Sequence, residues 1–275
     1  MNRVIFGDCR DTMRDLKAQG VRVQCCVTSP PYFGLRAYGD DPRELGRERT
    51  PAEYVAGLME VFDGVRELLS DDGVLFLNIG DGYAGYWGDK TATSTGTEPK
   101  ANRRGYDINA RPSFADAFGG SSIKPKDMLG IPWRVAFALQ DAGWYLRQEI
   151  IWRKPTPAAE GRASASRFTR AHESLFMLTK SYRYKFKDDR RLRSVWDIEP
   201  AAGNGLHFAT FPDELPRRCI EVASSVGDVV LDPFHGSGTT GRVAESMGRN
   251  WVACELYSKY APLQQARTAQ AALAI

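Results

Sequence analysis

The stretch Thr28-Ser29-Pro30-Pro31-Tyr32 places a hydroxyl, two stiff prolines and an aromatic ring directly after an apolar run. Because proline fixes its own φ and pushes the preceding residue toward extended geometry, the Ser29 and Pro30 carbonyls can be held toward one point. The Tyr32 ring can supply a stacking face beside these acceptors. Such a pocket suits a planar group bearing an NH2, such as the exocyclic amine of a nucleobase. A Pro-Pro pair taken alone more often marks a simple turn.

A second candidate site lies near the other end of the chain, in Asp232-Pro233-Phe234-His235-Gly236-Ser237-Gly238-Thr239-Thr240-Gly241. This glycine turn follows an apolar run and precedes an expected helix, where backbone N–H groups of an open α/β sheet bind nucleotide-like ligands. Gly236 and Gly238 let the backbone approach such a ligand closely. Glu255 ends the next expected strand, 19 residues after Gly236, where it can accept hydrogen bonds from ribose hydroxyls.

The spacing Gly236-x-Gly238-x-x-Gly241 also matches the dinucleotide fingerprint of NAD-dependent oxidoreductases. Four residues separate Leu231 from Gly236, which weakens that interpretation. A P-loop is not predicted, because no Gly-Lys-Ser or Gly-Lys-Thr follows the turn. Only 20 residues follow Glu255, too few for a second cofactor-binding half, so we expect the other strands of the sheet to come from the N-terminal part of the chain, with the glycine turn as a late part of a permuted sheet.

Alternating strands and helices surround the two motifs. Short apolar runs predict strands over residues 4–6, 23–27, 74–79, 150–152, 229–232 and 251–255. The run over residues 74–79 is typical of a strand buried on both faces of a parallel sheet. Helices are expected over residues 10–19, from Pro51 to a stop at Asp71-Asp72-Gly73, from Pro132, and after the glycine turn. This alternation predicts an open α/β sheet with helices on both faces.

Length and composition favour a globular chain, with 275 residues of which 43% are hydrophobic. No run approaches the roughly 18 apolar residues of a membrane-spanning helix, and the N-terminus has no signal-like stretch, so we expect a cytoplasmic protein. The five cysteines are an odd number and show no Cys-x2-Cys spacing. We therefore expect neither a disulfide framework nor a metal site.

Positive charge is concentrated in residues 153–193, which hold twelve Lys or Arg and four Asp or Glu, although the whole chain carries a formal net charge of only +3. Aromatic residues are interleaved with these charges. Because Lys and Arg neutralise phosphates, the segment is predicted to bind nucleic acid, and a solvated basic face is the alternative. Residues 83–126 are rich in Gly, Ser, Thr and Asn and have no sustained period, which predicts a long functional or mobile loop.

The two motifs, in this order, closely resemble those of the beta class of DNA amino-methyltransferases, which use S-adenosylmethionine (SAM). The resemblance covers most of the chain and implies a permuted Rossmann-like methyltransferase sheet with inserted irregular DNA-recognition segments. Supporting pieces are Gly7-Asp8-Cys9, Asn78-Ile79-Gly80-Asp81, Ile151-Trp152-Arg153-Lys154-Pro155, His172-Glu173 and Phe208-Ala209-Thr210-Phe211-Pro212.

By this resemblance, Ser29, Pro30, Pro31 and Tyr32 form the catalytic pocket. Asp8 is implied near the cofactor adenine, Glu255 at the ribose, and Phe211 over part of the cofactor. The implied cofactor site comprises Asp8, Thr28, Phe211, Asp232, Pro233, Phe234, Gly236, Ser237, Gly238, Thr239, Thr240 and Glu255. The candidate DNA contacts are Arg103, Arg104, Arg111, Arg162, Arg167 and Arg170.

The expected organisation has a catalytic part (1–82), an inserted loop with a possible role in DNA recognition (83–126), a further α/β part (127–154), an irregular basic segment with a possible role in target recognition (155–200) and a SAM-binding part (201–275). The partners implied are double-stranded DNA and a second copy of the chain, in a prokaryotic or phage-encoded homodimer. The enzyme would be an orphan or would belong to a restriction–modification system.

The implied reaction is site-specific methyl transfer from SAM to the exocyclic amine of a base flipped out of DNA, either adenine N6 or cytosine N4. In the family a Ser at the first motif position leans toward cytosine, with exceptions, and Ser29 can accept a hydrogen bond from either amine. No cysteine follows a proline, so the covalent route of cytosine C5 methylation is not predicted. An RNA amino-methyltransferase and a DNA-binding homologue without activity are the alternatives.

Overall fold

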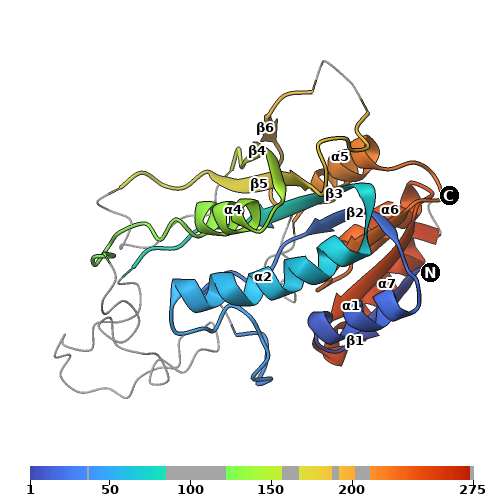
Figure 1. Ribbon diagram of the computed structural model, residues 1–275, viewed down its shortest axis with the longest axis horizontal. Coiled ribbons are helices and arrows are strands. Elements are labelled where there is room, and N and C mark those ends of the chain that lie inside the picture. Colours follow the sequence, from blue (N-terminus) through green and yellow to red (C-terminus); the bar gives the residue numbers. More distant parts are fainter. Residues whose placement is uncertain (36, 85–121, 157–166, 188–191, 202–210, 273–275) are drawn as a thin grey trace.

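The computed structural model describes residues 1–35, 37–84, 122–156, 167–187, 192–201 and 211–272 (Figure 1). Within this part of the chain, strands from both halves of the sequence form one sheet. The strands are β1 (Arg3–Phe6), β2 (Val23–Thr28), β3 (Leu69–Ile79), β4 (Tyr145–Arg153), β5 (His172–Thr179), β6 (Val195–Asp197), β7 (Val229–Asp232) and β8 (Asn250–Glu255). Their order across the sheet is β1-β8-β7-β2-β3-β5-β4-β6.

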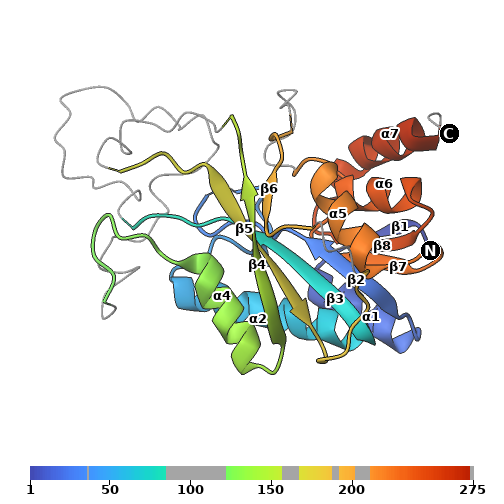
Figure 2. The same ribbon diagram turned by 90° about the horizontal axis from the view of Figure 1, so that it is seen from above.

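Helices cover both faces of this sheet. They are α1 (Cys9–Ala18), α2 (Pro51–Leu68), α4 (Ile131–Asp141), α5 (Glu214–Ala223), α6 (Thr239–Ser246) and α7 (Ala261–Ala272), with the short 3-10 helix η3 (Ser258–Tyr260) before α7. Figure 2 shows α1, α2 and α4 on one face and α5, α6 and α7 on the other. The three layers confirm the predicted α/β sheet with helices on both faces.

The sheet is permuted, as the sequence predicts. The first strand, β1, pairs in parallel with β8, the last strand, so that Ile5 lies opposite Cys254. Strand β7, which leads into the glycine turn, lies between β8 and β2. The N-terminal and C-terminal parts of the chain therefore build one sheet, and the two candidate motifs follow adjacent strands.

Two hydrophobic cores lie on the two faces of the sheet, and neighbouring residues of one strand alternate between them. On β2, Cys26 packs with the helices α1, α2 and α4, whereas Cys25 and Val27 pack with α5 and α6. This alternation follows from the two-residue period of a strand. Because both faces are covered, the run from Val23 to Val27 is almost entirely apolar.

The helix α2 begins as its sequence predicts. Thr50 Oγ1 accepts a hydrogen bond from the Glu53 N–H at 3.1 Å, and the Glu53 carboxylate accepts one from the Thr50 N–H at 3.3 Å. This reciprocal capping box gives hydrogen-bond partners to backbone N–H groups at the start of the helix, and Pro51 in the first turn has no N–H that needs a partner. Leu58 and Phe62 of the same helix are fully buried.

Several element boundaries differ from the prediction. The helix α2 ends at Leu68, not at Asp71-Asp72-Gly73, because β3 already begins at Leu69, where it pairs with Val23. The strand expected over residues 150–152 is the end of the longer β4. The strand over residues 74–79 is parallel to β2 but antiparallel to β5, so its apolar character reflects burial on both faces and not a wholly parallel sheet.

The prediction that residues 155–200 are irregular was wrong for its described part, which contains β5 and β6. The high count of Lys and Arg over residues 153–193 obscured the apolar run Leu175–Leu178, which lies in the core. Among the described residues, no helix combines the length and the hydropathy that spanning a bilayer requires.

Candidate active site

The two motifs meet at the edge of the sheet where β2 and β7 end. These strands are parallel neighbours, with Cys25 opposite Val230 and Cys26 opposite Leu231. One step further, the Thr28 hydroxyl donates a hydrogen bond to Asp232 Oδ1 at 2.7 Å, and both residues are buried. The structure therefore brings the Ser-Pro-Pro-Tyr loop and the glycine turn together, although 204 positions separate Thr28 from Asp232.

A polar cluster lies around the Ser-Pro-Pro-Tyr loop, residues 29–32, which we call the catalytic loop after its predicted role. The Tyr32 hydroxyl donates to Glu173 Oε2 at 2.6 Å, at the start of β5. Asn78 Nδ2, near the end of β3, donates to the same Tyr32 oxygen at 2.9 Å and to Glu173 Oε2 at 3.0 Å. The Ser29 hydroxyl lies 3.4 Å from the Tyr32 oxygen, and the Lys154 ammonium forms an ion pair with Glu173 Oε1.

Sequence patterns alone assigned no role to Asn78, Lys154 or Glu173, although each belongs to a piece that resembles the family. Their contact with Tyr32 depends on the pairing of β3, β4 and β5, and β5 was not predicted. The one available signal is a polar Asn78 inside an otherwise apolar strand.

The Tyr32 ring lies against the backbone at Gly80. A Cβ atom at position 80 would stand 2.4 Å from Tyr32 Cε2, which no side chain could tolerate without displacing the ring. Burial, and then the neighbouring Glu173 carboxylate, raise the pKa of the Tyr32 hydroxyl well above its usual value. Tyr32 therefore remains a protonated phenol that donates a hydrogen bond.

The loop is also anchored on α2. The Tyr54 hydroxyl donates to the Pro31 carbonyl oxygen at 2.7 Å, and Tyr54 is fully buried. The Phe33 ring packs against Tyr54 with centroids 5.5 Å apart. These contacts fix the chain on the far side of Pro30, which is itself buried.

The glycine turn has the backbone geometry that its sequence predicts. Gly236 and Gly238 have φ values of 52° and 92°, a region that other residues rarely adopt. Gly241 packs tightly, because a Cβ there would lie 2.8 Å from His235 Cε1 and 2.9 Å from Trp251 Cδ2. Within the part of the chain that the structure describes, no side chain caps the N-terminus of α6, so its first N–H groups face the turn, where a ligand can bind them.

Further contacts fix the remaining residues of the turn. Phe234 donates its N–H to Asp232 Oδ1 at 3.1 Å, and the Thr240 hydroxyl donates to the Val27 carbonyl at 3.3 Å. Arg267 of α7, which the sequence did not single out, donates to Ser237 Oγ at 2.7 Å and to Thr239 Oγ1 at 3.2 Å. Pro233 lies between Asp232 and Phe234 and is buried.

Glu255 lies beside this turn, at the end of β8. Its Oε2 accepts a hydrogen bond from the Gly236 N–H at 2.8 Å, and its Oε1 accepts one from the Tyr257 N–H at 2.9 Å. Burial raises the pKa of Glu255, and the two backbone hydrogen bonds only partly oppose that effect. Each oxygen retains a lone pair that a sugar hydroxyl can use.

Asp8 lies close to Glu255, because the Gly7 N–H donates to the Glu255 carbonyl oxygen at 2.9 Å. Its carboxylate caps α1 and binds Arg10 with both oxygens, at 3.0 Å and 2.6 Å. Burial alone would raise the pKa of Asp8, but the hydrogen bonds and charge of Arg10 outweigh it and leave the pKa below its usual value. Phe211 is half-buried against the core beneath α5 and α6.

Residues 37–49, which connect the catalytic loop to α2 along the chain, form a strap that contacts Tyr257. Glu44 is buried in it and accepts the N–H groups of Tyr38 and Gly39 at 2.8 Å and 2.9 Å. The Tyr257 hydroxyl also donates to Glu44. The strap thus packs against the residue that binds Glu255, a contact that the sequence did not reveal.

The candidate DNA contacts are only partly described. Arg103, Arg104, Arg111 and Arg162 lie outside the described residues. The guanidinium groups of Arg167 and Arg170 lie over the Tyr83 ring, 3.9 Å and 5.1 Å from its centroid. Arg170 also donates to the Asp81 carbonyl at 2.6 Å, so both arginines lie at the catalytic end of the sheet.

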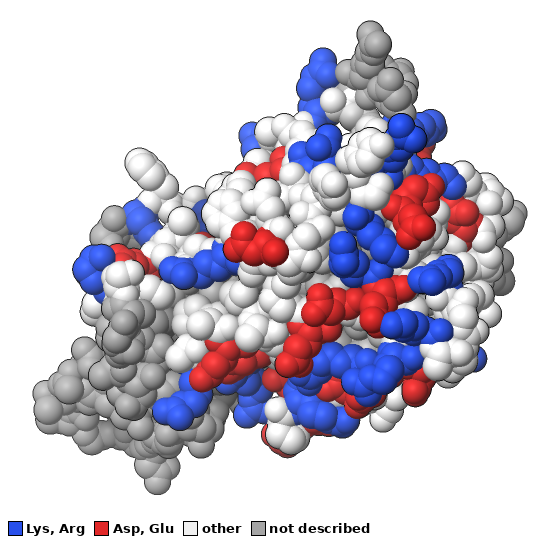
Figure 3. Space-filling model, in the orientation of Figure 1, with Lys and Arg blue, Asp and Glu red and all other residues white. Residues whose placement is uncertain are grey.

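The described part of the basic segment does not form one surface. Because β5 is antiparallel to β3, Glu173 lies at the catalytic end, whereas residues 180–187 lie roughly 25 Å away at the opposite end. There Lys185 pairs with Asp228 and Lys187 with Glu221. Figure 3 shows basic and acidic side chains side by side over much of the face that it draws.

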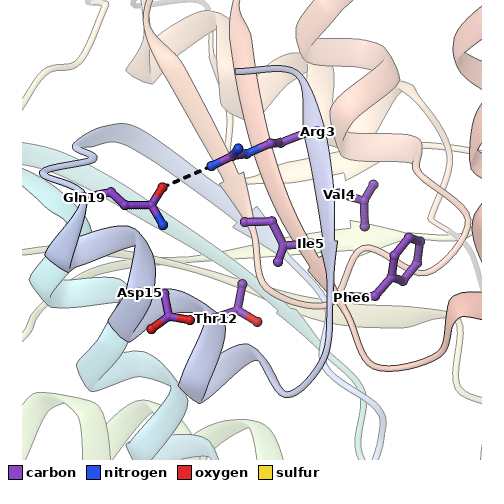
Figure 4. A pocket seen from close by; sticks show the side chains of 7 residues that line it. All are labelled: Arg3, Val4, Ile5, Phe6, Thr12, Asp15 and Gln19. Carbon is purple, nitrogen blue, oxygen red and sulfur yellow. Dashed lines mark hydrogen bonds between the residues drawn. The ribbon is translucent and has the colours of Figure 1, made fainter.

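No other feature of the described residues suggests a competing centre. All five cysteines are buried and free, and burial raises the pKa of the Cys9 thiol to about 12. The described residues hold no group of three His, Cys, Asp or Glu that could bind a metal. A hollow of about 420 Å³ at the outer edge strand contains none of the predicted site residues (Figure 4); it is lined by Arg3, Val4, Ile5, Phe6, Thr12, Asp15 and Gln19.

Comparison with known proteins gives a consistent result. A family described as DNA methylase matches residues 23–266. The chain is 42% identical to the type II methyltransferase M.Cfr9I of Citrobacter freundii over 270 residues, which cover 92% of this chain and 83% of that protein. It is 39% identical to the type II methyltransferase M.SmaI of Serratia marcescens over 278 residues, which cover 96% and 90%.

Solved structures share the fold. The PvuII DNA methyltransferase, which is cytosine-N4-specific, has a TM-score of 0.68 at 20% identity and is matched over 96% of this chain and 85% of its own. A putative DNA modification methylase of Thermus thermophilus, in complex with S-adenosyl-L-methionine, has a TM-score of 0.65 at 26% identity, with coverage of 98% and 94%.

Proposed function

The chain belongs to the DNA methylase family that its residues 23–266 match, and from this premise we propose how its active site works. As a member, it is a SAM-dependent enzyme that methylates an exocyclic amine of DNA at a specific site. The observation that carries the proposed site is the buried hydrogen bond between Thr28 and Asp232, because it joins the base-binding loop to the cofactor turn.

The residues of the glycine turn fit a SAM molecule. Two glycines with positive φ leave room for its methionine end, the open N-terminus of α6 favours its carboxylate, and the buried Glu255 can accept its ribose hydroxyls. When bound, SAM supplies a methyl group on a positively charged sulfonium. Asp8 would lie near the adenine and Phe211 along the cofactor, and Thr28, Asp232, Pro233, Phe234, Ser237, Thr239 and Thr240 would complete the site.

The catalytic loop would hold the target base. A base inside a duplex cannot reach the cofactor, so the target nucleotide must be flipped out, and Tyr32 would stack against it. Ser29 and the Pro30 carbonyl would accept its amino hydrogens. These hydrogen bonds draw the nitrogen lone pair out of conjugation and aim it at the methyl group, so catalysis rests on orientation and electrostatics. Cytosine N4 and adenine N6 both suit these acceptors.

The two halves of the proposed site can be tested separately. Ser29→Ala or Tyr32→Ala should greatly reduce methyl transfer while SAM still binds, and Asp232→Ala should abolish SAM binding measured by calorimetry. Turnover close to wild type in either loop variant would contradict the pocket assignment. Unchanged SAM affinity in the Asp232 variant would contradict the cofactor assignment.

Recognition of the DNA sequence belongs, in this proposal, to residues 83–126 and to the catalytic end of the 155–200 segment, with Arg167 and Arg170 as phosphate or guanine contacts. We also propose that the enzyme is a homodimer. Light scattering on the purified protein should give twice the chain mass of 30.6 kDa, and a mass of one chain would contradict the dimer.

A further inference from the structure

The hydroxyl groups of the catalytic loop can each donate or accept a hydrogen bond, and their direction matters for the reaction. In the proposed function, on which this inference rests, Ser29 must accept a hydrogen from the target amine. A serine that instead points its own hydrogen at the amine would oppose the pull on the nitrogen lone pair. Something in the structure must therefore fix which way the Ser29 hydrogen points.

Glu173 is the member of the polar cluster that accepts every hydrogen bond it makes there. Its Oε1 pairs with the Lys154 ammonium, and its Oε2 lies within hydrogen-bond distance of two donors, so both carboxylate oxygens act as acceptors. The Lys154 ammonium also lies over the Trp152 ring, 4.5 Å from its centroid, which limits its movement. Glu173 Oε1 is thus taken by Lys154, and Oε2 faces Tyr32 and Asn78.

The direction of each hydrogen bond in the cluster follows from the acceptor role of Glu173. Tyr32 donates to Glu173 at 2.6 Å, so the Tyr32 oxygen must accept, and the Ser29 hydroxyl 3.4 Å away can donate to it. Once its hydrogen points to Tyr32, Ser29 has only lone pairs left for the target amine.

Asn78 reinforces the same direction. Its two Nδ2 hydrogens are directed at the Tyr32 oxygen and at Glu173 Oε2, so both of these oxygens act as acceptors, and Ser29 Oγ lies 3.4 Å from the same nitrogen. The Oδ1 atom of this buried side chain has no hydrogen-bond partner among the described residues. The orientation of the amide is therefore set by the hydrogen bonds that its nitrogen donates within the polar cluster, and not by a hydrogen bond that its oxygen accepts.

We propose that Glu173 is a positioning residue that acts through the Tyr32 hydroxyl to make Ser29 a hydrogen-bond acceptor toward the target amine. The hydrogen bonds then run in one direction, from the amine to Ser29, from Ser29 to Tyr32 and from Tyr32 to Glu173. Tyr32 therefore has a second role besides stacking, because its hydroxyl links Ser29 to Glu173. Lys154 and Asn78 keep the direction of these hydrogen bonds fixed.

Glu173→Gln tests this direction with little change of shape. Lys154 would attract the glutamine carbonyl, so the amide NH2 would face Tyr32 and Asn78, and the Tyr32 hydrogen would have to turn toward Ser29. We expect kcat for DNA methylation to fall about 10-fold to 100-fold, while KM for DNA and the calorimetric Kd for SAM stay within about threefold. Tyr32→Phe, which keeps the stacking ring and removes the link, should lower kcat to a similar extent.

The double variant separates positioning from a general structural effect. If Glu173 acts through the Tyr32 hydroxyl, adding Glu173→Gln to Tyr32→Phe should lower kcat by no more than about twofold. Glu221→Gln is the matched control, because Glu221 pairs with Lys187 at the opposite end of the sheet. It should leave kcat and KM unchanged.

Wild-type kcat in Glu173→Gln, or losses that multiply in the double variant, would overturn the inference. So would a loss of SAM binding in Glu173→Gln equal to its loss of turnover. These outcomes differ from failure of the proposed function, which would appear as absent methyl transfer by the wild-type enzyme itself.

Discussion

Tyr32 combines a ring that packs on Gly80 with a hydroxyl bound to Glu173 and Asn78. The sequence alone predicts the ring as a stacking face, because an aromatic residue follows two prolines. It does not predict the partners of the hydroxyl, because Glu173 lies 141 positions away and meets Tyr32 only through strand pairing. At the residue scale, sequence patterns identify which groups can do chemistry, and the structure identifies what holds them.

The contact between Tyr32 and Gly80 predicts that one added methyl group at position 80 lowers kcat. Gly80→Ala would place a Cβ 2.4 Å from Tyr32 Cε2, so the ring must move away from its stacking position. We expect kcat to fall by about 100-fold, in line with the cost of a small misplacement of a positioned group. Gly82→Ala is the control, because among the described residues its Cβ would meet only Leu129 Cδ1, at 3.4 Å. Steady-state methylation assays that rank the two variants equally would contradict the role of Gly80.

The buried carboxylate of Glu255 predicts a pH dependence of cofactor binding. Because burial raises its pKa, Glu255 becomes protonated at a higher pH than the usual value of about 4.3, and it then loses an acceptor for the ribose. SAM affinity should therefore weaken as the pH falls through this raised pKa. The pKa of Asp8 is lowered, so Asp8 stays ionised over the same range.

Protonation of Glu255 has the opposite effect on folding stability from its effect on SAM affinity. A raised pKa means that the folded protein binds this proton more tightly than the unfolded chain, so the contribution of Glu255 to stability increases as the pH falls. A loss of affinity therefore does not reflect unfolding caused by this group. Calorimetry at a series of pH values, from neutrality down toward the usual glutamate pKa of about 4.3, should show the decline in the wild type and a flatter profile in Glu255→Gln. Equal profiles would contradict the assignment.

At the scale of elements, the adjacent ends of β2 and β7 bring the two motifs together. Their apolar runs and the turn that follows each were predictable, because buried strands and glycine turns have strong sequence signals. Strand β5 was not, because its apolar run Leu175–Leu178 lies within a segment dominated by Lys and Arg. Without β5, the sequence could not place Glu173 beside the catalytic loop.

The hydrogen bond between the strand ends predicts a coupled effect on stability and cofactor binding. Thr28→Val keeps the shape and removes the donor to the buried Asp232 carboxylate. We expect the free energy of unfolding to fall by about 1 kcal/mol, with weaker SAM binding, as measured by urea titration and calorimetry. Thr156→Val, at an exposed threonine that binds Glu199, should change neither quantity. Equal effects of the two substitutions would refute the link.

At the scale of the whole molecule, the antiparallel β5 divides the basic segment between two ends of the sheet. Charge counting along the sequence treats residues 153–193 as one surface, because it carries no information on chain direction. The structure instead leaves Arg167 and Arg170 near the catalytic loop and places residues 180–187 beside acidic partners at the other end.

This division predicts which charges contact DNA. Arg167→Ala should weaken DNA binding and reduce the slope of log K against log salt by about 1, because one phosphate contact is lost. Lys187→Ala, which removes a positive charge at the opposite end, should leave both quantities unchanged. Fluorescence anisotropy at several salt concentrations provides the comparison. A larger effect of the Lys187 variant would contradict the proposal that DNA binds at the catalytic end of the sheet.

The most direct test of the central claim is to identify the methylated base. The protein is incubated with methyl-labelled SAM and either duplex DNA or RNA, the nucleic acid is digested, and the nucleosides are separated by liquid chromatography, which resolves N4-methylcytosine from its isomer 5-methylcytosine, and identified by mass spectrometry. We predict label in N4-methylcytosine or N6-methyladenine from the wild type, and strongly reduced label from Ser29→Ala. Label found only in 5-methylcytosine, only in an RNA substrate, or in neither nucleic acid would contradict a DNA amino-methyltransferase built around Ser29 and Tyr32.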